Sequence, residues 1–153
     1  MLRNVFKGNL ISRTNYKAAT ELTVGMGVVR NYENMTAELP SAETADNIYL
    51  VAKERIPVGE ACARTDFSDY DPIFQTVAAD EPVKLCYYEP GLSFAVDAVS
   101  KTDAPVKGKA VAVGADGLWK LATVPSRYLY TEDYIDNGHA LIRIEVLDAP
   151  VTN

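Results

Sequence analysis

The sequence predicts an all-β protein, a compact antiparallel β-barrel or β-sandwich with an extended N-terminal arm. Eight prolines and nine glycines divide the 153 residues into short pieces, which leaves little room for long helices. Between these breaks, β-branched and aromatic residues alternate with polar ones, which is the pattern of half-buried strands. The length fits a single domain, because a chain of this size buries roughly 70% of the surface that it exposes when unfolded.

The N-terminal arm, residues 1–21, differs from the rest in charge. Four of the 15 basic residues and none of the 21 acidic ones lie in the first 17 positions, so these carry +4 and the remainder −10. An arm that is both basic and apolar can either fold back on its own acidic barrel or lie on a partner chain. If it binds a partner, deletion of residues 1–17 should leave the β-domain folded. The arm residues expected to bind the partner are Leu2, Arg3, Val5, Phe6, Lys7, Leu10, Ile11, Arg13 and Lys17.

The remaining residues, 22–153, are expected to form one antiparallel β-domain that opens with a hairpin. Residues 26–30 and 35–39 have apolar and β-branched side chains at strand spacing, and the polar turn Asn31-Tyr32-Glu33-Asn34 joins them. Ser41 after Pro40 is a good N-cap, which predicts a single helical turn over 41–46. Further strands are expected over 48–53, 73–77 and 94–99.

Two later segments show clear period-two alternation. In 83–88 the odd-numbered residues share one apolar face, and in 140–147 Arg143 and Glu145 alternate with aliphatic neighbours. Each is therefore predicted to be a strand with one face toward a core.

Turn residues place two more elements. Asp116-Gly117 supplies the positive φ angles of a tight turn, which predicts a hairpin between strands 109–114 and 117–123. Residues 126–137 fit either a helix closed by Gly138 or a strand that enters an Asn137-Gly138 turn. Their tyrosines favour strand and loop.

Charge and hydropathy exclude several classes of partner. A net charge of −6 and a pI near 4.8 argue against binding to a nucleic-acid backbone, which requires many basic groups. No apolar run approaches the ~20 residues that a membrane-spanning helix needs. The apolar stretch at the N-terminus is too short for a signal peptide, so assembly in the cytoplasm is expected.

Residues that could carry chemistry do not form a recognisable site. His139 is the single histidine, and it follows Glu132, Asp133 and Asp136, which would suit a metal or proton relay; a surface histidine beside a turn is the preferred interpretation. No GxSxG motif is present, and Gly25-Met26-Gly27 does not continue into a phosphate-binding loop. We therefore expect no enzyme, no cofactor and no metal.

Two further groups leave alternatives open. Asp66, Asp69 and Asp71 could offer oxygen ligands to calcium, but they lack the glycine and distal glutamate of an EF-hand loop, so a solvated acidic loop is preferred. Cys62 and Cys86 have no metal-binding spacing and are expected to be buried free thiols, with a disulfide between them as the alternative.

The order of segments resembles the auxiliary capsid proteins of tailed bacteriophages, known as decoration or cement proteins. The resemblance rests on GMGVVRNYENMTAEL, NIYLVAKE, ADEPVKLCYYEPG, KGKAVAVGADGLWK and GHALIRIEVL. It implies a non-enzymatic virion protein that binds the outer surface of the capsid and stabilises the shell. Its partners would be the major capsid protein and sister copies, as a homo-oligomer or on the lattice, in the virion and, during assembly, in the host cytoplasm.

Two alternatives come from other classes of protein. A phage tail, fibre or adhesin module that binds carbohydrate or a structural partner would expose Trp119 and several tyrosines on one face. A hydrolase that uses two carboxylates would have to bring them together in space.

Overall fold

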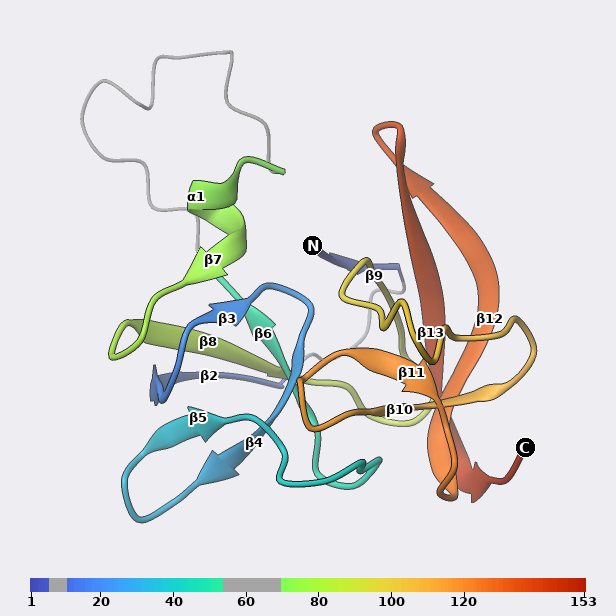
Figure 1. Cartoon of the computed structure of the whole chain (residues 1–153), viewed down its shortest axis with the longest axis horizontal. Coiled ribbons are helices and arrows are strands. Elements are labelled where there is room, and N and C mark those ends of the chain that lie inside the picture. Colours follow the sequence, from blue (N-terminus) through green and yellow to red (C-terminus); the bar gives the residue numbers. More distant parts are fainter. Residues whose placement is uncertain (6–10, 54–69) are drawn as a thin grey trace.

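The computed structural model describes residues 1–5, 11–53 and 70–153. The chain is almost entirely β, with 53% strand and 3% helix, which confirms the predicted fold class. Figure 1 shows a barrel on the left of the view and strands β10 to β13 of a second sheet on the right. In the described part of the chain, no helix is long and apolar enough to cross a membrane.

The closed barrel has the strand order β2-β5-β4-β6-β8. Its strands pair antiparallel, except that β2 and β5 run parallel where Lys17 lies opposite Thr36 and Ala18 opposite Ala37. The bounds are Ile11–Ala18 for β2, Gly27–Asn31 for β4, Thr36–Glu38 for β5, Tyr49–Ala52 for β6 and Pro82–Tyr87 for β8.

The second sheet has six strands in the order β1-β9-β13-β12-β10-β11, all antiparallel. A two-stranded sheet pairs β3, Leu22–Thr23, with β7, Thr76–Val77, which follows the short helix α1, Pro72–Gln75. The strands of the six-stranded sheet are β1 (Leu2–Asn4), β9 (Ser93–Val96), β10 (Ala110–Val113), β11 (Trp119–Leu121), β12 (Ser126–Asp136) and β13 (His139–Val151).

Strands β6 and β8 form a wall between two hydrophobic cores. Because side chains alternate along a strand, Val51 and the opposite Leu85 point into the barrel, while Leu50 and the opposite Cys86 point toward the six-stranded sheet. Gly27 lies opposite Leu50, and a Cβ there would stand 2.4 Å from Val113 Cγ2. The barrel and the six-stranded sheet therefore meet so closely at Gly27 that only glycine fits there.

Aromatic side chains fill the core on the sheet side of this wall. The Trp119 ring lies 5.0 Å from that of Tyr128 and 5.5 Å from that of Phe94, measured between ring centroids. Trp119 is fully buried, and its Nε1 donates to the Gly25 carbonyl at 3.1 Å. A buried indole N–H needs such an acceptor, so this bond fixes how the ring sits.

The turn chemistry explains the hairpins that were predicted. Gly117, at φ 77°, closes the β10–β11 hairpin. Asn137 and Gly138, at φ 52° and 86°, join β12 to β13, so residues 126–136 form a strand and the helical alternative is wrong. Observed strands also overlap the predicted ranges 26–30, 35–39, 48–53, 83–88, 94–99 and 140–147.

Two local predictions were wrong. Residues 41–46 form no helical turn, because Thr44 exchanges both backbone hydrogen bonds with Val113, each 2.9 Å long. Residues 73–77 are a strand only at Thr76 and Val77, since Asp71 caps α1 by accepting from Ile73 N and Pro72 suits the first helical turn.

An extended N-terminal arm is not confirmed. Strand β1 pairs with β9, and β2 pairs with β8 and β5, so both segments belong to sheets. Tyr16 and Ala18 are buried in the barrel core, and Met1 is buried beside Ala95 and Leu141. A segment with this apolar content is stabilised by joining the sheets, which favours the alternative in which it folds back on its own domain.

Candidate interaction surface at the barrel end

Arg30 is held by tyrosines at one end of the barrel. It lies two residues after the buried Val28, so its side chain leaves β4 on the inner face of the barrel. The guanidinium carbon lies 4.0 Å from the ring centroid of Tyr49, 4.9 Å from that of Tyr32 and 5.7 Å from that of Tyr16. Nη2 also donates to the Tyr32 hydroxyl at 2.8 Å. These contacts are cation–π interactions that fix the side chain in place.

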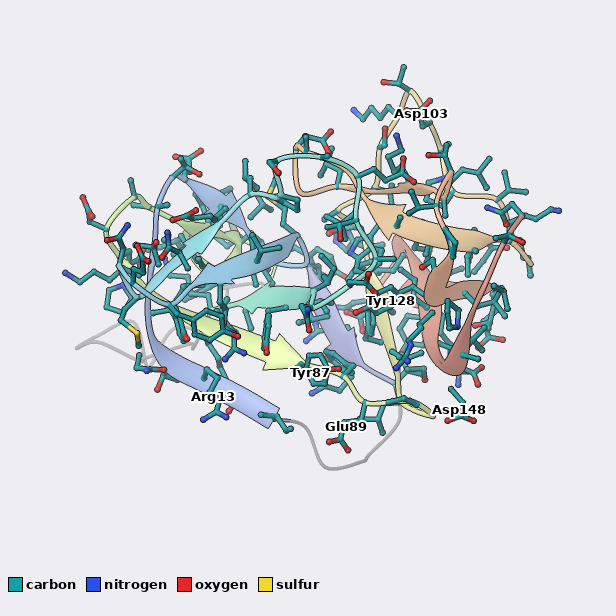
Figure 2. All side chains as sticks on the ribbon, turned by 90° about the horizontal axis from the view of Figure 1, so that it is seen from below. Arg13, Tyr87, Glu89, Asp103, Tyr128 and Asp148 are labelled. Carbon is teal, nitrogen blue, oxygen red and sulfur yellow. The ribbon has the colours of Figure 1, made fainter. Side chains whose placement is uncertain are left out.

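Tyr87 and β2 extend this group. The Tyr87 ring lies 5.4 Å from the Tyr49 ring, and Ile11 lies opposite Tyr87 in the β2–β8 ladder. Arg13 lies opposite Leu85 in the same ladder, and Figure 2 shows Arg13 and Tyr87 on the same side of the barrel. We call Arg30, Tyr16, Tyr32, Tyr49 and Tyr87 the arginine–tyrosine cluster.

The cluster has positive charge without an internal counter-charge. In the described residues, neither Arg13 nor Arg30 has a carboxylate within ion-pair distance, whereas Arg3 and Arg143 pair with Asp136 and Glu132 at 2.7 and 2.5 Å. Arg30 Nε is buried and has no hydrogen-bond partner. Burial raises the pKa of Tyr49 although both Arg30 and Arg13 act to lower it, so its hydroxyl stays protonated at neutral pH.

The first half of β2 is exposed and has one open edge. Residues 11–15 are exposed, and β8 is their pairing partner on one side. On the other side, β5 reaches only Lys17 and Ala18, so none of the described strands pairs with that edge over 11–15. Unpaired strand edges are sites where another chain can add a strand.

The nine residues predicted to bind a partner do not form one surface. Ile11, Arg13 and Lys17 are exposed on β2, beside the arginine–tyrosine cluster. Leu2, Arg3 and Val5 are half-buried on or beside the six-stranded sheet, where Val5 packs near Met1 and Leu141. Phe6, Lys7 and Leu10 lie outside the described residues.

Contacts at the N-terminus explain why this segment is held to the sheet. The Met1 amine donates to the Val24 carbonyl at 2.9 Å and pairs with Asp97. Burial lowers the pKa of this amine, and the hydrogen bond to Asp97 counteracts the shift in part. Arg3 Nε bonds Asp136 Oδ2, which also accepts from the Tyr70 hydroxyl at 2.9 Å.

The shifted pKa values in this region follow from the same contacts. Burial and the hydrogen bond to Asp136 raise the pKa of Tyr70 to about 12. Burial alone would raise the pKa of Asp136, but hydrogen bonds from Arg3 and Tyr70 outweigh it, so the pKa is lowered. This polar cluster ties β1 to the tip of the β12–β13 hairpin.

The described residues that the sequence suggested for metal binding or catalysis make contacts that stabilise the fold. The exposed His139 ring stacks on Tyr70, with centroids 3.6 Å apart and planes 14° from parallel. Asp71 is the N-cap of α1, and Cys86 is a buried free thiol whose pKa burial raises. Asp66, Asp69 and Cys62 lie outside the described residues. Within those residues, no group of three acidic, histidine or cysteine side chains is placed to hold a metal.

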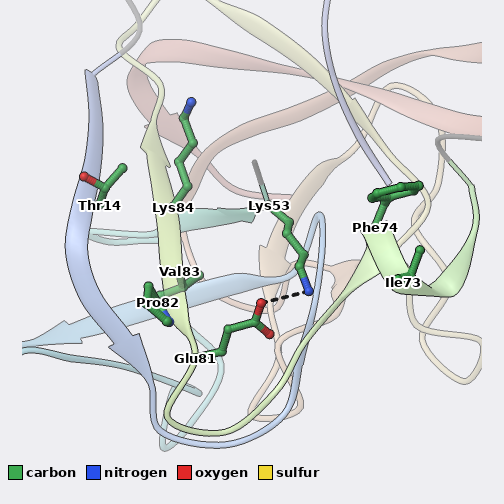
Figure 3. A pocket seen from close by; sticks show the side chains of 8 residues that line it. All are labelled: Thr14, Lys53, Ile73, Phe74, Glu81, Pro82, Val83 and Lys84. Carbon is green, nitrogen blue, oxygen red and sulfur yellow. Dashed lines mark ion pairs between the residues drawn. The ribbon is translucent and has the colours of Figure 1, made fainter. Parts of the chain in front are cut away.

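A pocket of about 350 Å³ lies between β8 and helix α1 (Figure 3). Two charged residues that line the pocket neutralise each other, because Lys53 Nζ pairs with Glu81 at 2.9 Å. Lys53 Nζ also donates to the Thr76 carbonyl at 2.6 Å. The lining residues are Thr14, Lys53, Ile73, Phe74, Glu81, Pro82, Val83 and Lys84.

Sequence reasoning did not find the arginine–tyrosine cluster. Alternation along β4 places Arg30 on the face of Val28, but only barrel closure brings β2, β6 and β8 around it. Trp119, which was considered for stacking on sugars, is buried in the core. Among the described tyrosines, Tyr32 is the exposed one, at 67% exposure, and Ile11 and Met35 are exposed apolar residues of the same barrel at 39% and 38%.

Comparisons with known proteins give no match: no protein family, no curated protein and no solved structure is significantly similar to the chain.

Proposed function

We propose that this chain is a non-enzymatic structural protein that binds the outer surface of a phage capsid and stabilises the shell. The segments that resemble decoration proteins correspond to the β4–β5 hairpin, β6, β8, the β10–β11 hairpin and β13, which are framework elements of the fold. The order of these segments along the chain is the part of the resemblance that supports the proposal.

The observation that carries the proposal is the surface at the barrel end. Arginine, tyrosine and methionine are the residue types that concentrate in protein interfaces, and arginine and tyrosine dominate binding hot spots. Here Tyr32 and Tyr49 hold Arg30, and Arg13 belongs to the stretch of β2 that has the open edge. A partner chain can thus find both side-chain anchors and free backbone groups.

On a capsid, weak contacts of each copy can still stabilise the whole shell. Many identical copies bind many identical sites, so a stabilisation that is small for each copy adds up over the particle. Function through an interface also fits a surface on which cation–π contacts hold the side chains in place.

Co-sedimentation with capsid particles assembled without the chain tests this proposal. The chain should bind saturably and raise the temperature at which the particles release their contents. Arg13→Ala should weaken binding, and Lys101→Ala, which removes an exposed cation elsewhere, should not. Absence of binding to any capsid particle by the folded protein would contradict the proposal.

A tail, fibre or adhesin module that binds carbohydrate is the second candidate. It is favoured by Tyr32, whose ring is exposed beside guanidinium donors, as in sites that stack on sugar rings. A glycan array separates the two: binding of a defined sugar that Tyr32→Ala abolishes, together with no binding to capsids, would select this function.

A further inference from the structure

Hydrogen-bond donors without a partner at the barrel end indicate the chemical class of ligand that would bind there. We propose that Arg13 and the arginine–tyrosine cluster bind the carboxylate of an Asp or Glu side chain in an acidic, extended segment of a partner protein. The choice of a protein as the source of this carboxylate rests on the proposed attachment function; the carboxylate itself follows from the side chains described here.

Arg30 is prearranged to bind an anion. Its guanidinium has five N–H donors, of which one bonds the Tyr32 hydroxyl. The ring of Tyr49 at 4.0 Å and that of Tyr32 at 4.9 Å limit its rotation. A fixed planar fork loses little conformational freedom when it pairs with a carboxylate.

Neighbouring hydroxyl groups provide additional donors. The Tyr49 and Tyr87 hydroxyls have no hydrogen-bond partner in the described parts of the chain, and their rings lie side by side at 5.4 Å. Arg13 on β2 lies opposite Leu85, and Leu85 lies opposite Val51, which shares the face of β6 with Tyr49. The Arg30 guanidinium and the Tyr49 and Tyr87 phenols thus provide donors at one end of the barrel, with Arg13 on the adjoining strand β2.

Among the described residues, no carboxylate lies within ion-pair distance of Arg30. Glu38, which lies on the adjacent strand β5, is occupied by Asn31 Nδ2 at 2.9 Å and Thr36 Oγ1 at 2.7 Å. Arg3 and Arg143 have carboxylate partners, whereas Arg30 has a buried Nε without a hydrogen-bond partner.

The open edge of β2 favours a polypeptide over a sugar or free phosphate. Backbone N–H and C=O groups along residues 11–15 can pair with an extended peptide, whereas a polysaccharide has no matching ladder. A peptide paired there would pass the Arg13 side chain, which leaves the same stretch of strand. Charge attraction to a basic site on an acidic protein would then select an acidic segment.

Titration with poly-L-glutamate, followed by calorimetry, tests the inference. Poly-L-glutamine controls for the backbone, hyaluronate presents carboxylates on a polysaccharide, and inorganic phosphate presents a free anion. Poly-L-glutamate should bind more tightly than the other three, and less tightly as salt screens the charges. Tighter binding of hyaluronate or phosphate would overturn the assignment to a protein segment.

Variants locate the site. Arg13→Ala, and Tyr49→Phe with Tyr87→Phe, should each weaken binding of poly-L-glutamate about tenfold, since hydrogen bonds to charged groups contribute that much. Lys101→Ala is the matched control, because it lies near Asp103, which Figure 2 places far from Arg13. Equal losses in Arg13→Ala and Lys101→Ala would show non-specific attraction and refute the site; melting curves verify that each variant is folded.

The capsid assay separates the two proposals. If the chain binds capsids but not poly-L-glutamate, the attachment function stands and the carboxylate site is wrong. If it binds poly-L-glutamate through Arg13 and Tyr49 but no capsid, the site stands and the attachment function is wrong.

Discussion

The indole Nε1 of Trp119 donates a hydrogen bond of 3.1 Å to the carbonyl of Gly25, a residue 94 positions earlier in the chain. Trp119 belongs to the six-stranded sheet, and Gly25 lies in the turn that leads into the barrel strand β4. This bond, together with the close approach at Gly27, joins the two parts of the fold at one point. The contribution of this hydrogen bond to the free energy of unfolding can be measured with a variant.

Trp119→Phe should lower the free energy of unfolding by about 2–4 kcal/mol, because it leaves the Gly25 carbonyl without its partner and opens a cavity. Guanidinium denaturation followed by circular dichroism measures this, since the variant lacks the single tryptophan. Tyr32→Phe, at an exposed position, should change it far less. Equal stability of Trp119→Phe and the wild type would show that the bond contributes nothing.

Gly27→Ala should destabilise the protein by about 1–3 kcal/mol through overpacking against Val113. Combining it with Val113→Ala should recover part of this loss, because the second change removes the methyl groups that the new Cβ meets. A double-mutant cycle on denaturation free energies measures the coupling. Strict additivity of the two changes would contradict the proposed clash.

Deletion of residues 1–17 should abolish cooperative unfolding. It removes Tyr16 from the barrel core, Met1 from the sheet and most of the strand that closes the barrel between β8 and β5. Differential scanning calorimetry of the truncated protein measures this. The variant Lys101→Ala, which changes an exposed side chain, serves as the control. A truncated protein that retains the full unfolding enthalpy would show that β2 is dispensable.

Alkaline pH should destabilise the protein in part through Tyr70. Its pKa is about 12 in the folded protein against 10 for an unperturbed tyrosine, so its stabilising contribution is complete below pH 10 and is lost as the pH rises toward 12. Tyr70→Phe should therefore lose less stability than the wild type between pH 10 and 12. Below pH 9 the two profiles should run parallel. Identical slopes above pH 10 would contradict the role of Tyr70.

Local patterns predicted much of the fold from the sequence. Asp116-Gly117 and Asn137-Gly138 mark hairpins because few residues adopt positive φ, and that constraint acts within a few residues. The alternation in 140–147 likewise identified part of β13. These features depend on residues that are close together in the sequence, so the sequence predicts them.

Features that depend on distant contacts were not predictable. Residues 41–46 have good helix-capping chemistry, but pairing with Val113 overrides it. The arginine–tyrosine cluster gathers from four strands, and nothing near Arg30 in the sequence indicates that Tyr49 will lie beneath it. The basic character of the first residues was visible, yet their place in two sheets depends on partners more than 60 residues away, such as Leu85 and Ala95.

The wall formed by β6 and β8 has a mechanical consequence. Adjacent residues such as Leu50 and Val51 belong to different cores, so neither half can melt without exposing the buried side of the other. The chain should therefore act as a single thermodynamic unit. A ligand that binds at the barrel end would protect the remote β12–β13 hairpin against hydrogen exchange as well, because the free energy of its binding is added to every global opening of the molecule.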